Sequence, residues 1–268
     1  SPLMHNESFR LLGLDYVYLC FDVNEETLPA AVAGLKTCGI RGFNLTMPNK
    51  NKIVELLDEL SPEAQLIGAV NTVLNDNGKL IGYNTDGYGF MQSVRDAGHD
   101  ITGKNITVMG VGGASMAICA QSALDGAASV HIFARRTSRY WNRTQKFAEN
   151  LSAKTGCQVC LFDNDDHTAL RDSIAQSYLL INATSVGMVP DIDDTIIKDT
   201  SLFHPELVVA DVVYEPQETR LLREAKAAGC QTFNGMYMLL HQGAKAFQIW
   251  TGQEMPVSVI KEKYFSVK

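Results

Sequence analysis

The sequence lacks any long apolar run of the kind that crosses a membrane. Nowhere in its 268 residues does an uninterrupted apolar stretch approach the ~20 residues that span a bilayer. The opening segment, Ser1 to Phe9, also lacks the basic and apolar stretches of a secretory signal. We therefore expect a protein of the cytoplasm.

A surplus of positive charge is missing as well. Lys and Arg number 23 against 30 Asp and Glu, which gives a formal net charge of −7. Nucleic acids and anionic membranes both favour a basic protein face, so neither is expected as a partner. Because 46% of the residues are hydrophobic, the chain can bury a core, and we expect it to be globular.

Cysteine is sparse and shows no disulfide framework. The six cysteines are scattered through apolar segments, which favours small buried side chains. Only Cys157-x-x-Cys160 has the spacing of a zinc or redox half-site, and no second pair or paired histidine completes it. We therefore expect no metal site.

Strand and helix signals alternate along the whole chain, which predicts an α/β fold with largely parallel sheets. In the first unit we expect strands at 16–23 and 40–45 and helices at 25–38 and 52–60. A hairpin of strands 71–74 and 80–83 should follow, with its turn at Asn75 to Gly78. A helix from Ser61-Pro62, a helix at 87–97 and two late helices, 236–250 and from about 256, are also expected.

A second unit begins after a polar crossing at 98–104. Its expected strands are 105–109, 129–134, 157–162, 178–182 and 207–213, separated by helical segments. This pattern is typical of a doubly wound sheet. We therefore predict two α/β domains, one of residues 1–88 with about 237–268 and one of residues 89–236.

A glycine loop joins the first strand of that second unit to an alanine-rich helix. Glycines permit a tight turn and a close approach of the backbone to phosphate, while a helix N-terminus offers free N–H groups. The spacing departs from G-x-G-x-x-G, and a purely structural turn is the alternative. The expected dinucleotide contacts, in a Rossmann-type domain, are Gly110, Gly112, Gly113, Ala114 and Ser115.

A basic run follows the second strand of this unit, where an NAD-selective fold places a carboxylate. Guanidinium groups pair with phosphate, so the run favours the 2′-phosphate of NADP over the free hydroxyl of NAD. A solvated basic turn is the alternative. The residues concerned are Arg135, Arg136, Thr137 and Arg139.

Polar segments also end several strands of the first unit, and in open α/β sheets ligands bind beyond such ends. At these and other positions the chain resembles the shikimate and quinate dehydrogenases. The resemblance extends over nearly the whole chain in seven collinear motifs: SP..HN from Ser1, NLTMPNK from Asn44, GAVNT from Gly68, GYNTDG from Gly82, GVGGAS from Gly110, NATSVGM from Asn182 and GMYMLLHQGAKAF from Gly235.

The resemblance implies a set of site residues. Lys50 and Asp86 would be the catalytic pair that moves a proton at the C3 oxygen of a cyclic hydroxy acid. The implied substrate-binding residues are Ser1, Tyr18, Thr46, Asn71, Tyr214 and Gln242. The implied nicotinamide-side residues are Asn182, Thr184, Ser185, Met188 and Gly235.

Three features depart from the family pattern. The chain begins at the second serine of the family's Ser-x-Ser-Pro motif, so we expect an N-terminally trimmed sequence that lacks the family's first strand. The loop Thr46 to Lys50 mixes the threonine of shikimate-specific members with the Met-Pro-Asn-Lys of quinate-using members. The run Arg139 to Arg143 resembles an insertion at the adenosine end.

The implied activity is reversible reduction of 3-dehydroshikimate to shikimate with NADPH, in aromatic amino-acid biosynthesis, by a monomer or homodimer whose two domains close around a cleft. One alternative is a dual-specificity quinate/shikimate dehydrogenase that also accepts NAD. Others are an NADP-sensing regulatory protein on the same scaffold and a folate-type dehydrogenase.

Overall fold

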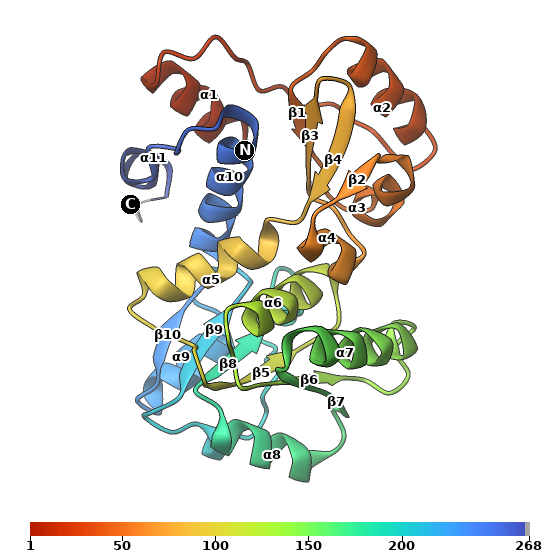
Figure 1. Cartoon of the computed structure of the whole chain (residues 1–268). Coiled ribbons are helices and arrows are strands. Elements are labelled where there is room, and N and C mark those ends of the chain that lie inside the picture. The colour runs from red at the N-terminus through yellow and green to blue at the C-terminus, as the bar shows by residue number, and fades with distance from the viewer. Residues whose placement is uncertain (266–268) are drawn as a thin grey trace. The chain divides into compact units, whose positions relative to one another are not determined.

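The computed structural model describes residues 1–265, which form two compact units (Figure 1). The first unit comprises Ser1–Gly89 and Leu239–Lys268, and the second comprises Phe90–Met238. The chain passes between the units within two helices, α5 (Asp86–Asp96) and α10 (Met236–Thr251). Each unit has its own sheet.

The first unit is built on a mixed four-stranded sheet in the order β1-β3-β4-β2. Strands β1 (Gly42–Asn44) and β4 (Lys79–Tyr83) both run antiparallel to β3 (Thr72–Asp76), while β2 (Glu59–Leu60) runs parallel to β4. The predicted hairpin is confirmed: Asn77 and Gly78 turn between β3 and β4 with φ values of 53° and 92°. Because of this hairpin, the sheet is not largely parallel as expected.

Short helices surround this sheet. They are α1 (Pro2–Leu11), α2 (Leu28–Thr37), α3 (Asn49–Lys52), the 3-10 turn η1 (Ile53–Leu56), α4 (Pro62–Ile67) and α11 (Val257–Tyr264). The helix predicted from Ser61-Pro62 is confirmed, since the Ser61 hydroxyl accepts from the Ala64 amide at 3.2 Å as an N-cap. Apolar side chains from α2, η1, α4 and the strands form one core: Leu28, Val32, Ile53, Ala64, Val70, Val73 and Leu80.

Two further predictions in the first unit are wrong. Residues 16–23 form no strand. No described strand pairs with this segment, the Tyr18 backbone bonds to the Asn6 side chain instead, and Val17, Leu19 and Phe21 are exposed. A strand exists only where a neighbouring backbone satisfies its N–H and C=O groups, and alternation alone supplies no partner. The helix predicted over 52–60 instead begins at Asn49 and ends at Leu56.

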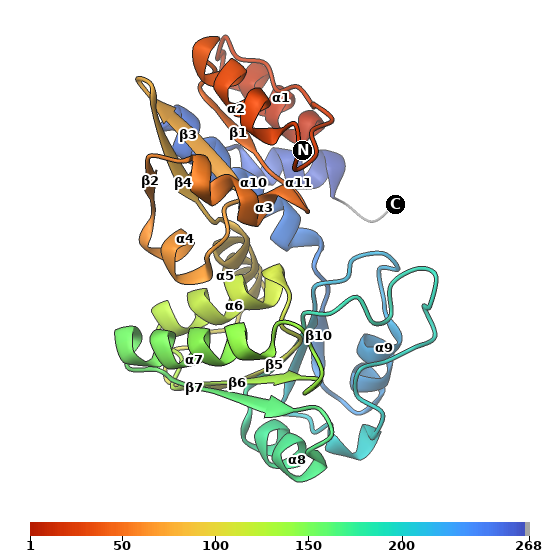
Figure 2. The same cartoon turned by 90° about the vertical axis from the view of Figure 1, so that its right-hand side faces the viewer.

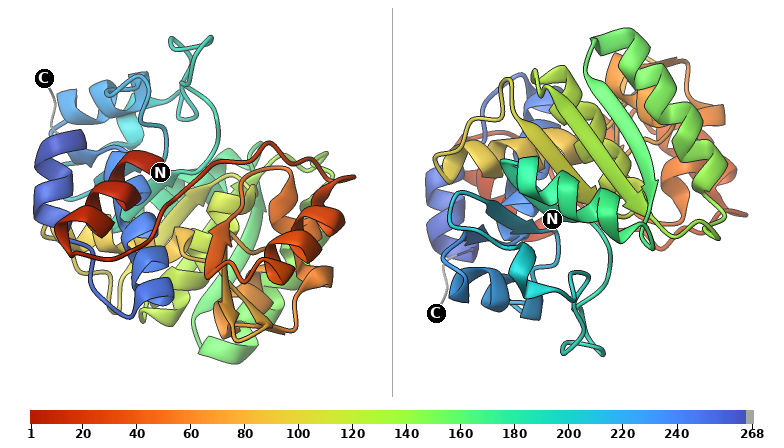
Figure 3. Two further views of the ribbon diagram at one scale, coloured as in Figure 1. Left: turned by 90° about the horizontal axis from the view of Figure 1, so that it is seen from above. Right: turned by 90° about the horizontal axis from the view of Figure 1, so that it is seen from below.

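Helix α10 belongs to the first unit over most of its length and packs on that sheet. The Trp250 indole N–H donates to the Val73 carbonyl at 2.9 Å, and the Arg41 guanidinium donates to the Trp250 carbonyl at 2.8 Å. At Gly42 a Cβ atom would lie 2.2 Å from the Trp250 indole nitrogen, so only glycine fits beneath this ring. Figure 3 shows α1 beside α10 and α11.

The second unit contains a six-stranded, wholly parallel sheet in the order β10-β9-β8-β5-β6-β7. The predicted doubly wound fold is thus confirmed. The strands are β5 (Asn105–Met109), β6 (Ser129–Ala134), β7 (Gln158–Asp163), β8 (Leu179–Asn182), β9 (Val208–Asp211) and the unpredicted β10 (Gln231–Phe233). The strand order reverses between β5 and β8, where such folds bind ligands.

Helices lie on both faces of the second sheet (Figure 2). On one face lie α6 (Gly113–Leu124) and α7 (Trp141–Thr155), and on the other α8 (His167–Gln176). Residues of α8 and of α9 (Arg220–Ala227) share one core with the strands, which includes Ile174, Leu180, Val209 and Leu222. A 3-10 turn, η2 (Thr200–Leu202), precedes β9.

Two further observations concern the described part of the chain. None of its helices is both long enough and apolar enough to cross a bilayer. Cys119, Cys157 and Cys230 are buried as expected, but Cys20 and Cys38 are exposed. For these two cysteines the expectation of burial is wrong, because their flanking residues are not part of the core.

Candidate active site

The ammonium of Lys50 and the carboxylate of Asp86 form an ion pair in the first unit, with Nζ 2.6 Å from Oδ2. Lys50 lies in α3, and its carbonyl accepts from the Val70 amide at 2.8 Å. Asp86 is the first residue of α5, where the helix dipole favours a carboxylate. The two side chains are 22% and 12% exposed, so the pair is sheltered yet reachable.

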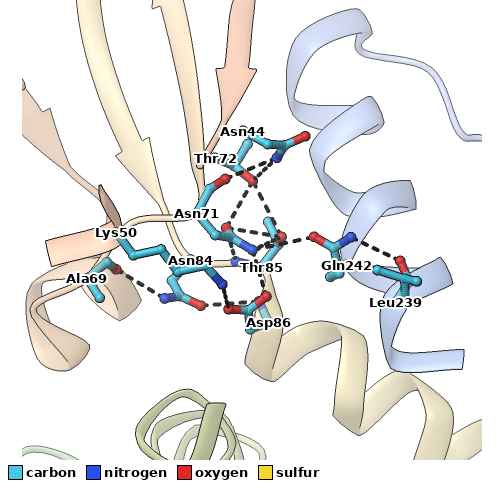
Figure 4. Close-up of polar contacts among 10 residues, drawn as sticks. All are labelled: Asn44, Lys50, Ala69, Asn71, Thr72, Asn84, Thr85, Asp86, Leu239 and Gln242. Atoms are coloured by element: carbon cyan, nitrogen blue, oxygen red, sulfur yellow. Dashed lines mark hydrogen bonds and ion pairs between the residues drawn. The ribbon is translucent and has the colours of Figure 1, made fainter. Parts of the chain in front are cut away.

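Asn71 connects this pair to the sheet (Figure 4). Its Nδ2 group donates to Asp86 Oδ1 at 2.8 Å and to the Thr85 hydroxyl at 2.9 Å. A longer contact of 3.5 Å reaches Gln242 Oε1 on α10, whose own Nε2 donates to the Leu239 carbonyl. Asn71 is 2% exposed, so these bonds fix a buried amide next to the carboxylate.

The polar network continues away from the ion pair to a tyrosine. Thr72 Oγ1 donates to Asn71 Oδ1 at 2.9 Å and accepts from Asn44 Nδ2 at 3.0 Å. Asn44 Oδ1 in turn accepts from the Tyr18 hydroxyl at 3.0 Å. Burial raises the pKa of Tyr18, so its phenol keeps the proton that it donates.

An aromatic cluster packs against Tyr18. The His5 ring stacks on the Tyr18 ring with centroids 4.7 Å apart, and Trp250 and Phe247 lie at 5.3 and 6.2 Å from His5. His5 is fully buried, and this burial lowers its pKa to about 3. A neutral ring therefore holds Tyr18 in place.

Most of the site residues predicted in the first unit belong to one hydrogen-bonded network. One connected polar network includes Tyr18, Lys50, Asn71, Asp86 and Gln242, and Ser1, the N-cap of α1, lies near Tyr18. Thr46 is exposed in the loop before α3. Tyr214 belongs to the second unit, where it follows β9 and is 47% exposed.

The glycine loop of the second unit leaves room for a phosphate group. At Gly112 and Gly113 a Cβ atom would meet nothing within 4 Å, so the space beside the start of α6 is open. Gly112 is the N-cap of α6 and brings no side-chain hydrogen bond, which leaves first-turn N–H groups for a ligand. Ser115 Oγ donates to the Gly110 carbonyl at 2.5 Å, and Gly110 has a φ of 111°. These residues fit a dinucleotide pyrophosphate.

The loop after β8 is held by its own side chains. Asn182 Nδ2 donates to Asp211 Oδ1 at 3.0 Å, and Asn182 Oδ1 accepts from the Thr184 hydroxyl at 2.6 Å. Ser185 and Met188 are exposed on this loop. At Gly235 a Cβ atom would lie 2.1 Å from the Val212 carbonyl oxygen, so a side chain is excluded there.

The predicted basic run forms an exposed turn after β6. The Arg136 guanidinium lies over the Trp141 ring at 4.6 Å, and the Arg139 guanidinium lies over the Tyr140 ring at 4.7 Å. Arg135 and Thr137 are exposed in the same turn. Asp163, at the end of β7, accepts from the Arg136 backbone N–H at 3.3 Å, so a carboxylate does reach this turn from a neighbouring strand.

Sequence reasoning missed several contributors to these two regions. Asn44 and Thr72 stand inside quoted motifs, but nothing in their spacing says that they touch each other. Trp141 gave no signal beyond its place in the insertion-like run. Within residues 1–265, no group of three or more His, Cys, Asp or Glu side chains is arranged to hold a metal ion.

Comparisons with known proteins show which family the chain belongs to. Residues 1–73 match the family model described as the shikimate dehydrogenase substrate binding domain, and residues 235–263 match that of the shikimate 5′-dehydrogenase C-terminal domain. A Listeria innocua protein named shikimate dehydrogenase (NADP(+)) is 52% identical over 265 residues, which cover 99% of this chain and 91% of that protein.

Solved structures give the same result. Shikimate 5-dehydrogenase from Listeria monocytogenes, in complex with shikimate and NAD, has a TM-score of 0.94 and 51% identity, and covers 97% of this chain and 90% of that one. Quinate dehydrogenase from Corynebacterium glutamicum, in complex with NAD, has a TM-score of 0.87 and 32% identity, over 99% and 94% of the two chains. The chain belongs to the shikimate dehydrogenase family.

Proposed function

We propose that this protein catalyses the reversible reduction of 3-dehydroshikimate to shikimate with NADPH. The observation that carries the proposal is the sheltered Lys50–Asp86 ion pair at 2.6 Å, in contact with a buried amide network. The relative from Listeria innocua bears the name of this activity. Membership of the family and an intact proton-transfer pair together favour an enzyme.

In this proposal Lys50 moves the proton at the reacting oxygen. Its ammonium donates to the C3 oxygen as that oxygen gains negative charge, and recovers a proton in the reverse direction. Asp86 keeps the ammonium in place and shares its proton. The bound cofactor supplies the hydride.

The remaining polar groups of the first unit would hold the substrate. Hydroxyls and amides suit the ring hydroxyls and carboxylate of a cyclic hydroxy acid. The residues proposed for this role are Ser1, Tyr18, Thr46, Asn71, Tyr214 and Gln242. Because all but Tyr214 lie in the first unit, we assign substrate binding to that unit.

We assign the dinucleotide to the second unit. The open space beside Gly112 and Gly113 would take the pyrophosphate at the start of α6. Arg135, Arg136, Thr137 and Arg139 would recognise the 2′-phosphate, which favours NADP over NAD. The loop residues Asn182, Thr184, Ser185 and Met188, with Gly235, would border the nicotinamide; Asn182 and Thr184 would act by shaping the loop.

A second candidate is a dual-specificity quinate/shikimate dehydrogenase. Tyr18, which resembles the tyrosine of quinate-using members, is connected to the ion pair through Asn44, Thr72 and Asn71. Relatives in complex with NAD are known, including the quinate dehydrogenase. A regulatory NADP sensor, by contrast, would need no ion pair next to a substrate site.

One assay separates these candidates. Shikimate and quinate are each tested with NADP+ and with NAD+, and formation of the reduced cofactor is followed by its absorbance. The proposed function requires turnover of shikimate with NADP+. A kcat/KM for quinate within roughly tenfold of that for shikimate, a gap of about 1.4 kcal/mol, would instead favour dual specificity. Absence of any turnover would favour the sensor.

We further propose a cytoplasmic protein that is a monomer or a homodimer. Light scattering after size-exclusion chromatography distinguishes these two states. A larger assembly would contradict this expectation.

A further inference from the structure

Asn44 uses every hydrogen-bonding group of its amide inside the first unit, and Figure 4 shows the bonds of its Nδ2. Its Oδ1 accepts from the Tyr18 hydroxyl at 3.0 Å. Its Nδ2 donates to the Asn71 carbonyl at 3.1 Å and to the Thr72 hydroxyl at 3.0 Å. The Asn71 carbonyl can only accept, so it fixes which way round the amide of Asn44 lies.

The direction of the Thr72 hydroxyl follows from that orientation. Because Thr72 Oγ1 accepts from Asn44, its single hydrogen is free for Asn71 Oδ1, which lies 2.9 Å away. Thr72 is fully buried, so water cannot replace either bond. The hydrogen bonds therefore run in one direction, from Tyr18 to Asn44 to Thr72 to Asn71.

The far end of this series is the carboxylate of the ion pair. The Thr85 amide N–H and the Thr72 hydroxyl both donate to Asn71 Oδ1, which turns Asn71 Nδ2 toward Asp86 Oδ1 at 2.8 Å. The other oxygen of Asp86 holds Lys50. Each bond thus limits the orientation of the next group.

We propose that Asn44 and Thr72 are positioning residues, which form a directional hydrogen-bond relay that holds Asn71, and through it Asp86, in the geometry needed for proton transfer. The inference rests on the proposed function, because the relay ends on the proposed catalytic pair. It adds that this series of hydrogen bonds couples the orientation of Tyr18, which we assign to the substrate site, to the geometry of the Lys50–Asp86 pair. A substrate that displaces the Tyr18 hydroxyl would disturb the pair through the same bonds.

Thr72, in the middle of the relay, can be substituted with and without loss of its hydroxyl. Thr72→Val keeps the shape of the side chain and removes the hydroxyl, whereas Thr72→Ser keeps the hydroxyl. We expect Thr72→Val to lower kcat for shikimate oxidation roughly tenfold, which corresponds to about 1.4 kcal/mol, with KM changed less than about twofold. Thr72→Ser should retain kcat within about twofold of the wild type.

Asn75 supplies a matched control in β3 of the same sheet. Asn75 is buried and Asn44 is half-buried, and the Oδ1 of Asn75 accepts from the Gly78 amide in the hairpin turn, away from the relay. Asn44→Ala and Asn75→Ala should both lower thermal stability, because each removes an amide that is hydrogen-bonded inside the first unit. Only Asn44→Ala should also lower kcat. If Thr72→Val does not fold, the comparison of Asn44→Ala with Asn75→Ala still tests the relay.

Three results would overturn the relay. They are a wild-type kcat in folded Thr72→Val, an equal loss of kcat in Thr72→Val and Thr72→Ser, and an equal loss of kcat in Asn44→Ala and Asn75→Ala. Wild-type protein that does not oxidise shikimate with NADP+ would overturn the proposed function and the relay together. The wild-type assay therefore shows whether the proposed function fails or only the relay does.

Discussion

At the scale of single residues, α3 presents two lysines in different surroundings. Lys50 pairs with the sheltered Asp86, while Lys52 pairs with the exposed Glu55 at 3.0 Å. Surface ion pairs of the second kind contribute little to stability. Substitution of Lys50 removes the proposed proton-transfer group, whereas substitution of Lys52 removes only a surface charge from the same helix.

We expect Lys50→Ala to lower kcat for shikimate oxidation by about 10²–10⁴-fold, the usual contribution of a positioned acid–base group, with little change in KM. Steady-state kinetics at saturating NADP+ measure both constants. Lys52→Ala is the control and should remain close to the wild type. A Lys50→Ala enzyme that keeps half of the wild-type kcat would exclude the proposed role.

Arg136 and Arg139 both lie over aromatic rings, but the partner of Arg136, Trp141, is buried, at 7% exposed, whereas Tyr140 under Arg139 is half-buried. A cation–π contact of this kind contributes about 0.5–1 kcal/mol at exposed sites and restricts the guanidinium before any ligand arrives. We therefore expect Arg136→Ala to raise KM for NADPH much more than KM for NADH. Binding of adenosine 2′,5′-bisphosphate, followed by calorimetry, should weaken in parallel.

Lys154→Ala, at the C-terminal end of α7, is the control for Arg136→Ala. It removes a positive charge from the helix that follows the turn of Arg136, without touching that turn. Equal rises in KM for NADPH and NADH in Arg136→Ala would show that this arginine does not recognise the 2′-phosphate.

The site residues found from the sequence are those that the resemblance supplied. Lys50, Asp86, Asn71 and Gln242 were all named in this way, and the structure joins them. Asn44 was not named, because its importance lies in bonds to a carbonyl and a hydroxyl from another strand. Spacing along one chain does not encode such pairings.

At the scale of elements, two glycines of the loop between β5 and α6 have different reasons to be glycine. Gly110 has a φ of 111°, and a Cβ atom there would lie 2.8 Å from Thr184 Cγ2. Gly112 has a φ of −78°, which any residue can adopt, and has open space around it. Folding therefore requires glycine at Gly110, whereas only a ligand would require it at Gly112.

This difference predicts opposite behaviour for two variants. Gly112→Val should leave the melting temperature within a few degrees of the wild type and weaken NADPH binding by more than about tenfold, because its side chain occupies the proposed phosphate space. Gly110→Val should lower the melting temperature itself. Scanning calorimetry and NADPH titration test both variants, and undiminished binding by Gly112→Val would place the pyrophosphate elsewhere.

Elements were predictable where the signal is local. The buried strands β5 and β6 were predicted with their observed limits, because continuous apolar runs between turns mark strands buried on both faces. The segment 16–23 was predicted as a strand, but no described strand lies beside it, and its Tyr18 backbone bonds to the Asn6 side chain. The short strands β2 and β10 were missed because two or three residues are too few to show a period.

At the scale of the whole molecule, the two tryptophans lie in different units. Trp141 belongs to the second unit, and Trp250 belongs to the aromatic cluster of the first. A Trp141→Phe background therefore leaves Trp250 as the only indole, and its fluorescence follows the unfolding of the first unit. This matters because a chain with two units need not unfold in a single step.

That background tests the effect of the buried histidine on acid stability. His5 has a pKa of about 3 in the folded chain because of its burial, and neither ring nitrogen has a hydrogen-bond partner within the described residues. In the unfolded chain a histidine gains its proton near pH 6.5. As the pH falls from about 6.5 toward 3, the unfolded state binds a proton that the folded state refuses, so the first unit loses stability, by at most about 1.4 kcal/mol per pH unit from this group.

We therefore expect His5→Phe, which keeps an aromatic ring in the stack, to flatten the fall of the urea midpoint between about pH 6.5 and pH 4, the range in which the unfolded histidine is protonated. His167→Phe is the control, because His167 is exposed at the start of α8 in the other unit and should leave the midpoint of Trp250 unchanged. An unaltered slope in His5→Phe would mean that His5 is reached by water and protonated in the folded protein. In that case its ring could not be the neutral support on which Tyr18 rests.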